Sequence, residues 1–528
     1  MDTWIVNGMV VDGTGAPRRR ADLRIVDGII ADVVEGGGSA HERQGPCIDA
    51  EGLVVAPGFI DLHSHSDVAL LVDPVVPSKL NQGITLEVLG QDGMSVAPLT
   101  DATADPWRRH LSGLAGSYDI PWDWRTFENY LDRFGPTAAN VAVLVGHGTL
   151  RLNVIGMADR PATSTELDRM SWLLREALAS GAFGLSGGLV YTPGSYGTYE
   201  ELVALNRIVV EANKLWMVHI RYEGDRIAEG LDEMFRLVEE TGVSLHISHF
   251  KALGRSNWGR GPEIVERVER QRQQGMDVTV DQYPYTAGST MLSAVLPPWA
   301  HAEGPERLLQ LLHDAEAVAQ MEADIDSGLP GWEGFVNSIG WDNVRISDVG
   351  ESNHVELVGR SVTEIADLWH SPPFQAAVRL LIEGDLAVSM VVHAMHEDDV
   401  TAIMRAPWRM GGTDALLGGK PHPRSYGSYP RVLGHYARER GIISLEEAVR
   451  QMTGAAARRL RLTDRGSIEI GKRADLCLFD PDRVRDRATF AEPEQLPDGI
   501  AWVMVNGEPV LHDHEPTGKL PGSILRQQ

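Results

Sequence analysis

Cysteine is almost absent from this chain. Its 528 residues include only two, Cys47 and Cys477, each in an apolar stretch near one end of the sequence. Two cysteines cannot build the disulfide framework on which small secreted domains rely. We expect both to be reduced side chains buried in a core, rather than zinc ligands or a bridge between the two ends.

Long hydrophobic runs and positive charge are scarce as well. No apolar run approaches the about 18 to 20 residues that cross a bilayer, and the sequence opens on a strand-and-turn pattern instead of a secretory signal. Lys plus Arg number 48 against 74 Asp plus Glu, a net charge of −26, which repels nucleic acid and anionic membranes. We therefore expect a cytoplasmic protein that acts on a small molecule, without nucleic-acid or membrane partners. Whether it forms a homo-oligomer stays open.

The two ends of the chain have the same pattern. Residues 3–57 are short alternating strands separated by turns, and residues 466–512 repeat this character. Each block is too small to bury a core of its own. We expect residues 1–57 and 466–528 to pair as one β-sandwich.

Between the ends, short apolar strands alternate with amphipathic helical patterns such as 166–179, 264–274 and 445–460. Candidate strands end near His63, Gly90, Gly146, Ser186, His219, His249, Asp281 and Asp414. Eight such strands over residues 58–465 predict an α/β fold, a (β/α)8 TIM-like barrel. Irregular spacing at about 288–350 predicts a small insertion over the barrel mouth. The apolar run at 387–392 belongs either to this insertion or to the barrel.

Histidine and aspartate occur where the predicted strands end, which is where a barrel places its active site. His63 and His65 are two residues apart, so a strand directs both imidazoles to one face. His219, His249 and Asp414 each end a further apolar run. A lone histidine in this position is more often a hydrogen-bonded core residue, but imidazoles and a carboxylate together are a zinc-type ligand set. The joint pattern predicts a metal site.

The order of the motifs resembles the amidohydrolase superfamily, and within it the N-acyl-D-amino-acid deacylases, or D-aminoacylases. The resemblance spans nearly the whole chain. It is carried by APGFIDLHSHSD at 56–67, LVGHGTLR at 144–151, GLSGGLVYTPG at 184–194, HIRYEG at 219–224, ISHFKALG at 247–254, DQYPYTAGST at 281–290, GGTD at 411–414 and HPRSYGSYPRVL at 422–433. The fourth strand has no lysine, which favours the deacylases over hydantoinase-like and dihydroorotase-like enzymes, because those bridge two metals with a carboxylated lysine.

The resemblance implies that His219 and His249 hold one tightly bound Zn²⁺, and that His63, His65 and Asp414 line a weaker position for a second divalent ion. Whether one or two ions are needed stays open.

One motif departs from the family, which commonly has Asn-Cys-Gly after the second strand, with the cysteine as a metal ligand. This chain has Gln91, Asp92 and Gly93 there. A carboxylate can bind and bridge zinc, so we expect Asp92 to be a ligand rather than only a turn residue. Replacing the soft thiolate is expected to favour harder, more exchangeable ions.

Asp414 is also the expected catalytic residue, which takes a proton from water and passes it to the departing nitrogen. Lys251 and Tyr283 are placed to bind the substrate carboxylate. The resemblance adds Tyr191 and Arg424, and Ser289, as pocket residues.

Residues 282–300 contain no Lys or Arg and are apolar, with Met291, Leu292, Val295, Leu296 and Trp299. The sequence thus predicts zinc-dependent hydrolysis of N-acyl-D-amino acids with a neutral or hydrophobic side chain. Two alternatives remain. One is another metal-dependent amidohydrolase, for a cyclic amide, a D-dipeptide or a carbamoyl substrate, and the other is a catalytically silent scaffold.

Overall fold

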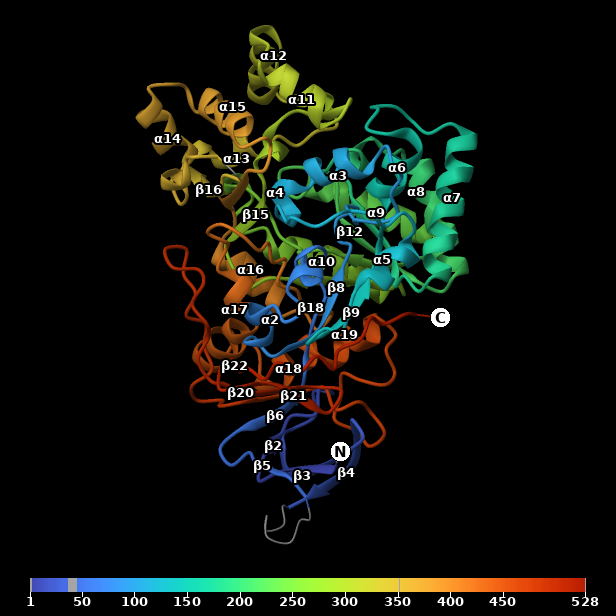
Figure 1. The fold of residues 1–528 in the computed structure, drawn as a ribbon, viewed down its shortest axis with the longest axis vertical. Coiled ribbons are helices and arrows are strands. Elements are labelled where there is room, and N and C mark those ends of the chain that lie inside the picture. Colours follow the sequence, from blue (N-terminus) through green and yellow to red (C-terminus); the bar gives the residue numbers. More distant parts are fainter. Residues whose placement is uncertain (1, 37–44, 351, 528) are drawn as a thin grey trace.

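The structure, a computed structural model, describes residues 2–36, 45–350 and 352–527. Figure 1 shows three regions along its long axis, with a sheet that carries the N-terminus at the bottom, strands and helices in the middle, and further helices at the top. None of the helices in the described ranges has both the length and the apolar character of a membrane-spanning helix.

Both ends of the chain contribute to a single ten-stranded sheet. Its strands are β1 (Asp2–Val6), β2 (Met9–Val10), β3 (Arg19–Val26), β4 (Ile29–Glu35), β5 (Cys47–Asp49), β6 (Val54–Pro57), β19 (Leu476–Phe479), β20 (Ile500–Val505), β21 (Glu508–His512) and β22 (Glu515–Pro516). The halves join where β6 pairs antiparallel with β19, with Ala56 opposite Cys477. Side chains from both halves share one core, including Leu23, Val55 and Leu476. Neither end completes this core alone.

The expectation of two buried cysteines was wrong for Cys47, because its side chain is exposed whereas Cys477 is buried. β5 is the edge strand of the sheet and pairs only with β1 along the strand order. An edge strand is covered by neighbours on one side only, so a cysteine there remains accessible.

Eight parallel strands form the barrel, and together they confirm the predicted fold class. They are β7 (Phe59–Asp61), β8 (Ile84–Leu89), β9 (Asn140–Val143) continued by β10 (Val145–Gly146), β11 (Gly184–Gly188), β12 (Leu215–His219), β13 (Ser244–Ile247), β14 (Val278–Gln282) and β18 (Arg409–Gly411). The ring closes between its last and first strands, where the amide of Leu62 donates to the carbonyl of Gly411 at 3.3 Å and Ser64 forms a parallel bridge with Ala415. Ile60, Leu86 and Met217 belong to the apolar cluster of the barrel strands.

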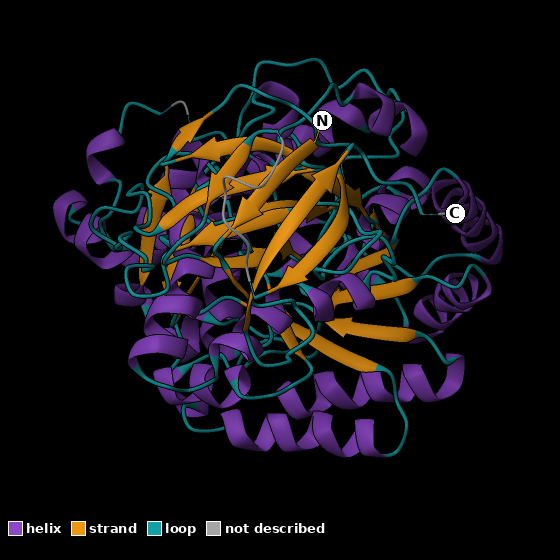
Figure 2. Ribbon diagram, turned by 90° about the horizontal axis from the view of Figure 1, so that it is seen from below, coloured by secondary structure: helices purple, strands orange, loops and turns teal. Residues whose placement is uncertain are grey.

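Helices surround the strands, as Figure 2 shows from below. The main ones are α5 (Phe127–Arg133), α6 (His147–Ile155), α7 (Ser164–Ala179), α8 (Tyr199–Glu211), α9 (Ile227–Thr241), α10 (Gly261–Gln273), α16 (Glu397–Met404), α18 (Leu445–Met452) and α19 (Gly454–Arg459). α7 begins with a capping box between Thr163 and Glu166. The predicted helix at 445–460 is interrupted at Thr453. A side chain at Gly454 would collide with the carbonyl of Gly13, so the break accommodates the N-terminal segment.

A second, antiparallel sheet lies beyond β14, in the order β15 (Ala287–Met291), β17 (Ser389–His393) and β16 (Val344–Asp348). The run at 387–392 therefore belongs to this insertion and not to the barrel. The helices between these strands include α11 (Pro305–Leu312), α12 (Ala315–Ser327), α13 (Val336–Ile339), α14 (Val362–Trp369) and α15 (Pro373–Glu383). The central strand β17 ends at His393, so the sheet extends past residue 350, where we expected the insertion to end. We propose that residues 1–57 and 466–528 form the β-sandwich domain and that residues 58–465 form the barrel domain.

Candidate metal centre and substrate pocket

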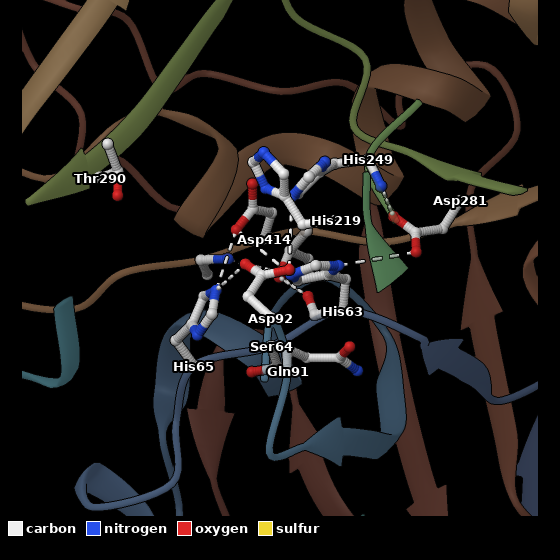
Figure 3. Close-up of polar contacts among 12 residues, drawn as sticks. His63, Ser64, His65, Gln91, Asp92, His219, His249, Asp281, Thr290 and Asp414 are labelled. Carbon is white, nitrogen blue, oxygen red and sulfur yellow. Dashed lines mark hydrogen bonds and ion pairs between the residues drawn. The ribbon is translucent and has the colours of Figure 1, made fainter. Parts of the chain in front are cut away.

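Six buried side chains converge at the carboxyl ends of the barrel strands, as Figure 3 shows. They form two groups whose potential ligand atoms lie within 4.8 Å of one another, His63, His65, Asp92 and Asp414 in the first and Asp92, His219 and His249 in the second. These are the six residues that the sequence nominated. The structure thus brings together residues that are up to 351 positions apart, from 63 to 414.

Asp92 belongs to both groups because its two oxygens face different histidines. Its Oδ2 lies 3.4 Å from Nε2 of His63 and 3.5 Å from Nε2 of His65, whereas its Oδ1 lies 3.5 Å from Nε2 of His249. This is the arrangement of a carboxylate that bridges two ions.

The remaining ligands complete each group. Oδ1 of Asp414 lies 3.2 Å from Nε2 of His65 and 3.6 Å from Nε2 of His63. In the second group, Nδ1 of His219 lies 2.9 Å from Nε2 of His249. Each group therefore presents imidazole nitrogen and carboxylate oxygen to a common point.

The buried polar atoms of this site fit a metal centre. Among the described residues, both ring nitrogens of His63, Nε2 of His65 and Oδ1 of Asp92 have no hydrogen-bond partner although they are buried. Buried polar atoms without partners are uncommon unless a ligand satisfies them. Nitrogen and carboxylate oxygen are zinc ligands, so the residues fit the group that the sequence pattern implies.

Three of the six residues have left-handed backbone conformations, with φ of 55° at Asp92, 34° at His249 and 50° at Asp414. Non-glycine residues adopt such angles rarely, and strain of this kind concentrates at functional sites. The turn at Asp92 lies tight against β11, where a side chain at Gly188 would collide with the Asp92 carbonyl. Gly188, the last residue of GLSGG, therefore makes room for Asp92.

Two acidic residues that received no role from the sequence orient the histidines. Glu223 lies 3.2 Å from Nδ1 of His249 and 3.4 Å from Nε2 of His219. Asp281 accepts a 2.8 Å hydrogen bond from the amide of His249 and lies 3.6 Å from Nδ1 of His63. Carboxylates commonly fix ligating histidines in this way. The available signals were the position of Glu223 four residues after His219 and the place of Asp281 at a strand end.

His246 was left out of the predicted site, and it lies in neither group of potential ligands. Its ring is buried, with Nε2 3.0 Å from Asp281 and Nδ1 2.7 Å from Thr279. Its polar atoms are therefore satisfied by the protein itself.

The acidic residues and the histidines shift one another's pKa. Burial opposes the charged form of His63, but Asp92 and Asp414 outweigh it and hold the pKa of His63 well above its ordinary value. Burial would raise the pKa of Asp414, but Arg424 and His63 outweigh it and lower that pKa. Burial lowers the pKa of His219 to about 4. At neutral pH, Asp414 is thus ionised and His219 is neutral.

A pocket opens above these groups, between the barrel and the insertion. All five predicted substrate residues line it, namely Tyr191, Lys251, Tyr283, Ser289 and Arg424. His219, His249 and Asp414 form part of the same wall, so substrate and metal ligands share one space. The insertion contributes Ser289 from β15.

Both predicted cations of the pocket have acidic partners. Nζ of Lys251 lies 2.6 and 2.8 Å from the two oxygens of Glu223, and Nη1 of Arg424 lies 2.8 Å from Oδ2 of Asp414. The Arg424 guanidinium lies over the Tyr283 ring, 4.6 Å from its centre. In the described part of the chain, Nε of Arg424 is buried and donates to no acceptor.

Tyr191 and Ser289 are held in the wall by their own contacts. The Tyr191 hydroxyl lies 3.0 Å from that of Thr290, and its ring lies edge-on to His219 with 5.1 Å between ring centres. The Ser289 hydroxyl donates to the carbonyl of Met390 at 2.9 Å. Ser289 is thus tied to the insertion sheet, whereas Tyr191 stands beside the second ligand group.

The apolar wall differs from the expectation. Val190, Leu253, Ala294, Phe335 and Val392 line the pocket. Of the five residues named from the sequence, Met291 and Leu296 line a smaller cavity beside it. The chain after β15 forms a short 3-10 helix, Leu292–Val295, whose Ala294 lines both cavities.

Known proteins resemble this chain over its full length. The model of the amidohydrolase family matches residues 47–511. Two relatives from Alcaligenes xylosoxydans xylosoxydans each match about the whole chain and 97% of their own length, a D-aminoacylase at 37% identity and an N-acyl-D-glutamate deacylase at 35%.

Solved structures agree with these relatives. A D-aminoacylase, described with a binuclear metal centre, has a TM-score of 0.84 and 34% identity. An N-acyl-D-glutamate deacylase from Bordetella bronchiseptica, complexed with zinc and a phosphonate mimic of the tetrahedral intermediate, has a TM-score of 0.82 and 35% identity. Both comparisons cover 100% of each chain. The chain therefore belongs to the amidohydrolase family, within its branch of D-aminoacylases and N-acyl-D-amino-acid deacylases, and is a metal-dependent amide hydrolase.

Proposed function

We propose that this enzyme uses zinc to hydrolyse the amide bond of N-acyl-D-amino acids with a neutral or hydrophobic side chain, releasing a carboxylate and the free D-amino acid. One observation carries the proposal. The oxygens of Asp92 are divided between two groups of histidines, directly below a pocket that also contains cationic side chains. The names of the relatives supply the D-amino-acid part of the proposal.

The metal ligands would act as one tight and one weaker position. His219, His249 and Asp92 would hold the tight ion, while His63, His65 and Asp414 would line the second. Zinc bound there would lower the pKa of a water molecule toward about 7 and polarise the amide carbonyl.

Asp414 is placed to move the proton. Its Oδ1 faces His63 and His65, and its Oδ2 is held by Arg424, which keeps the carboxylate ionised before reaction. The carboxylate can take a proton from the attacking water and deliver it to the departing nitrogen. An amide needs this second transfer because an unprotonated amine is a poor leaving group.

The substrate carboxylate would be bound by Arg424, Lys251 and Tyr283. The free Nε of Arg424 supplies a charged donor, and charge-assisted hydrogen bonds are among the strongest available to a carboxylate. Tyr283 is buried beside both cations, so its hydroxyl stays protonated and able to donate, since burial raises its pKa.

A neutral side chain fits the rest of the pocket. Among the described residues, the wall contains one further arginine, Arg221, which pairs with Glu233 at 3.1 Å and donates to the carbonyl of Ser195 at 2.9 Å. Glu333 adds a carboxyl group to the same wall. A second substrate carboxylate would lose its hydration there without gaining an unpaired cation, which disfavours it.

A substrate panel tests the proposal. We expect kcat/KM for N-acetyl-D-leucine to exceed that for N-acetyl-D-glutamate by about 10-fold or more, in the range that pocket contacts discriminate. N-acetyl-L-leucine and a cyclic hydantoin are the controls for stereochemistry and for ring opening. Faster turnover of the glutamate derivative would overturn the side-chain assignment, and faster turnover of the hydantoin would overturn the linear-amide assignment.

A further inference from the structure

A smaller cavity adjoins the substrate pocket and contains two histidines that the proposed reaction does not use. The two spaces share Val190, Tyr191 and Ala294 as lining residues. His110, at the end of α3 (Ala104–His110), and His301 are also among the residues that line the smaller one. Their rings meet edge-on with 6.0 Å between centres. The histidine pair therefore lies beside the substrate pocket, across the wall formed by Val190, Tyr191 and Ala294.

Each ring leaves one nitrogen without a partner. Nε2 of His301 lies 3.2 Å from the carbonyl of Ser293, and a carbonyl can only accept, so this nitrogen carries the proton. Nδ1 of His301 is then a lone-pair acceptor, and it is buried with no partner among the described residues.

His110 is a second acceptor of this kind. A hydrogen bond to the backbone of Thr192 favours its protonated ring, so the ring is the donor in that bond. Its Nε2 is buried and has no partner in the described chain. Trp107 stacks on the His110 ring with 5.1 Å between ring centres.

Both rings are neutral near pH 7. Burial lowers the pKa of His110 to about 3 and that of His301 to about 4. The cavity thus offers two neutral acceptors surrounded by apolar groups such as Met291 and Leu296. The unprotonated nitrogen of a neutral imidazole accepts from an N–H or O–H group and repels a carboxylate.

We propose that this cavity is an accessory subsite that accepts a neutral substituent of the substrate ending in a hydrogen-bond donor, such as a primary carboxamide. The proposal rests on the proposed N-acyl-D-amino-acid activity and adds a preference within it. The donor group would come from the amino-acid side chain or from the acyl group, which share this chemistry, and the two sources are separated by experiment.

The first experiment compares substrates with and without the donor. For the side chain, the pair is N-acetyl-D-glutamine and N-acetyl-D-methionine; for the acyl group, it is N-succinamoyl-D-leucine and N-pentanoyl-D-leucine. We expect kcat/KM to favour the carboxamide by about 10-fold in one of the two pairs. Equal or lower values for the carboxamide in both pairs would overturn the subsite and leave an ordinary water-filled cavity.

The second experiment removes the acceptors while keeping ring volume. His301→Phe and His110→Phe should each reduce the carboxamide preference to about unity, because an apolar ring cannot accept the N–H group. His313→Phe, at an exposed histidine, is the matched control and should keep the wild-type preference. A preference that persists in both cavity variants would contradict the assignment.

N-acetyl-D-alanine separates the two proposals, since its methyl side chain cannot reach the cavity. If the wild-type enzyme hydrolyses it but shows no carboxamide preference, only the subsite fails. If no N-acyl-D-amino acid is hydrolysed, the proposed function fails and the subsite with it.

Discussion

At the scale of single residues, Asp92 is the candidate ligand that both histidine groups share. The sequence pointed to it only as a departure from a family motif, and its oxygens face both histidine groups. The ligand candidates could be predicted because they follow apolar strands. Their supporting residues could not, because Glu223 and Asp281 resemble ordinary polar residues until distances to His219, His249 and His63 are known.

Replacing Asp92 tests its bridging role. Asp92→Asn keeps the shape of the side chain but removes its charge and one of its two ligand oxygens. We expect reduced metal content and a loss of kcat/KM of at least about 100-fold, since metal generates the nucleophile. Metal analysis and initial rates on N-acetyl-D-leucine measure both.

Two variants control this prediction. Asp105→Asn changes an aspartate whose side chain is 87% exposed and should have no effect. Asp92→Cys supplies the thiolate that the family commonly carries and should retain the tight ion. Normal metal content and rate in Asp92→Asn would show that Asp92 is only a turn residue.

At the scale of elements, the first and last barrel strands are joined below the metal centre by a buried lysine. Nζ of Lys79 lies 2.6 Å from Asp61 at the end of β7, 3.1 Å from Glu87 in β8 and 2.9 Å from the Thr413 hydroxyl after β18. Asp61 in turn accepts from the Thr413 amide at 2.8 Å. This network fixes the strand ends that carry His63 and Asp414.

Lys79→Met should therefore destabilise the protein strongly. Removing one partner leaves buried carboxylates without compensation, which costs about 3–5 kcal/mol in the free energy of unfolding. Denaturant unfolding of the metal-loaded protein measures the change. Arg270→Met, which breaks an exposed pair with Glu266, should leave that free energy nearly unchanged. A Lys79→Met protein as stable as the wild type would contradict this account.

The barrel strands were predictable because buried parallel strands are short apolar runs that end in polar residues. The insertion was not, because the strands of its sheet are separated by long irregular stretches. The run at 387–392 is equally apolar in a barrel strand or in β17, and only its antiparallel pairing with β15 and β16 distinguishes them.

At the scale of the whole molecule, strands from the two ends of the chain pair with each other in one sheet. β6 leads directly into the barrel and pairs with β19, which follows the last barrel helices. The similar patterns at the two ends predicted this partnership. They could not give the register of the paired strands, because register depends on side-chain fit across strands.

Removing one end should unfold the other. A chain of residues 1–465 lacks β19 and exposes the apolar face of β6, so we expect aggregation or loss of cooperative thermal unfolding. Adding residues 466–528 as a separate chain in the same cells should restore soluble, active protein. A truncated chain that unfolded cooperatively at the wild-type temperature would show that the N-terminal strands are independent.

We propose that side chains from distant strand ends hold the metal that drives amide hydrolysis. The most direct measurement is the rate of N-acetyl-D-leucine hydrolysis by chelator-stripped protein as Zn²⁺ is returned, with bound metal counted at each step. We expect no turnover in the stripped protein, recovery as Zn²⁺ binds, and metal binding without turnover in Asp414→Asn. Undiminished hydrolysis by metal-free protein, or near-normal rates in Asp414→Asn, would contradict the proposal.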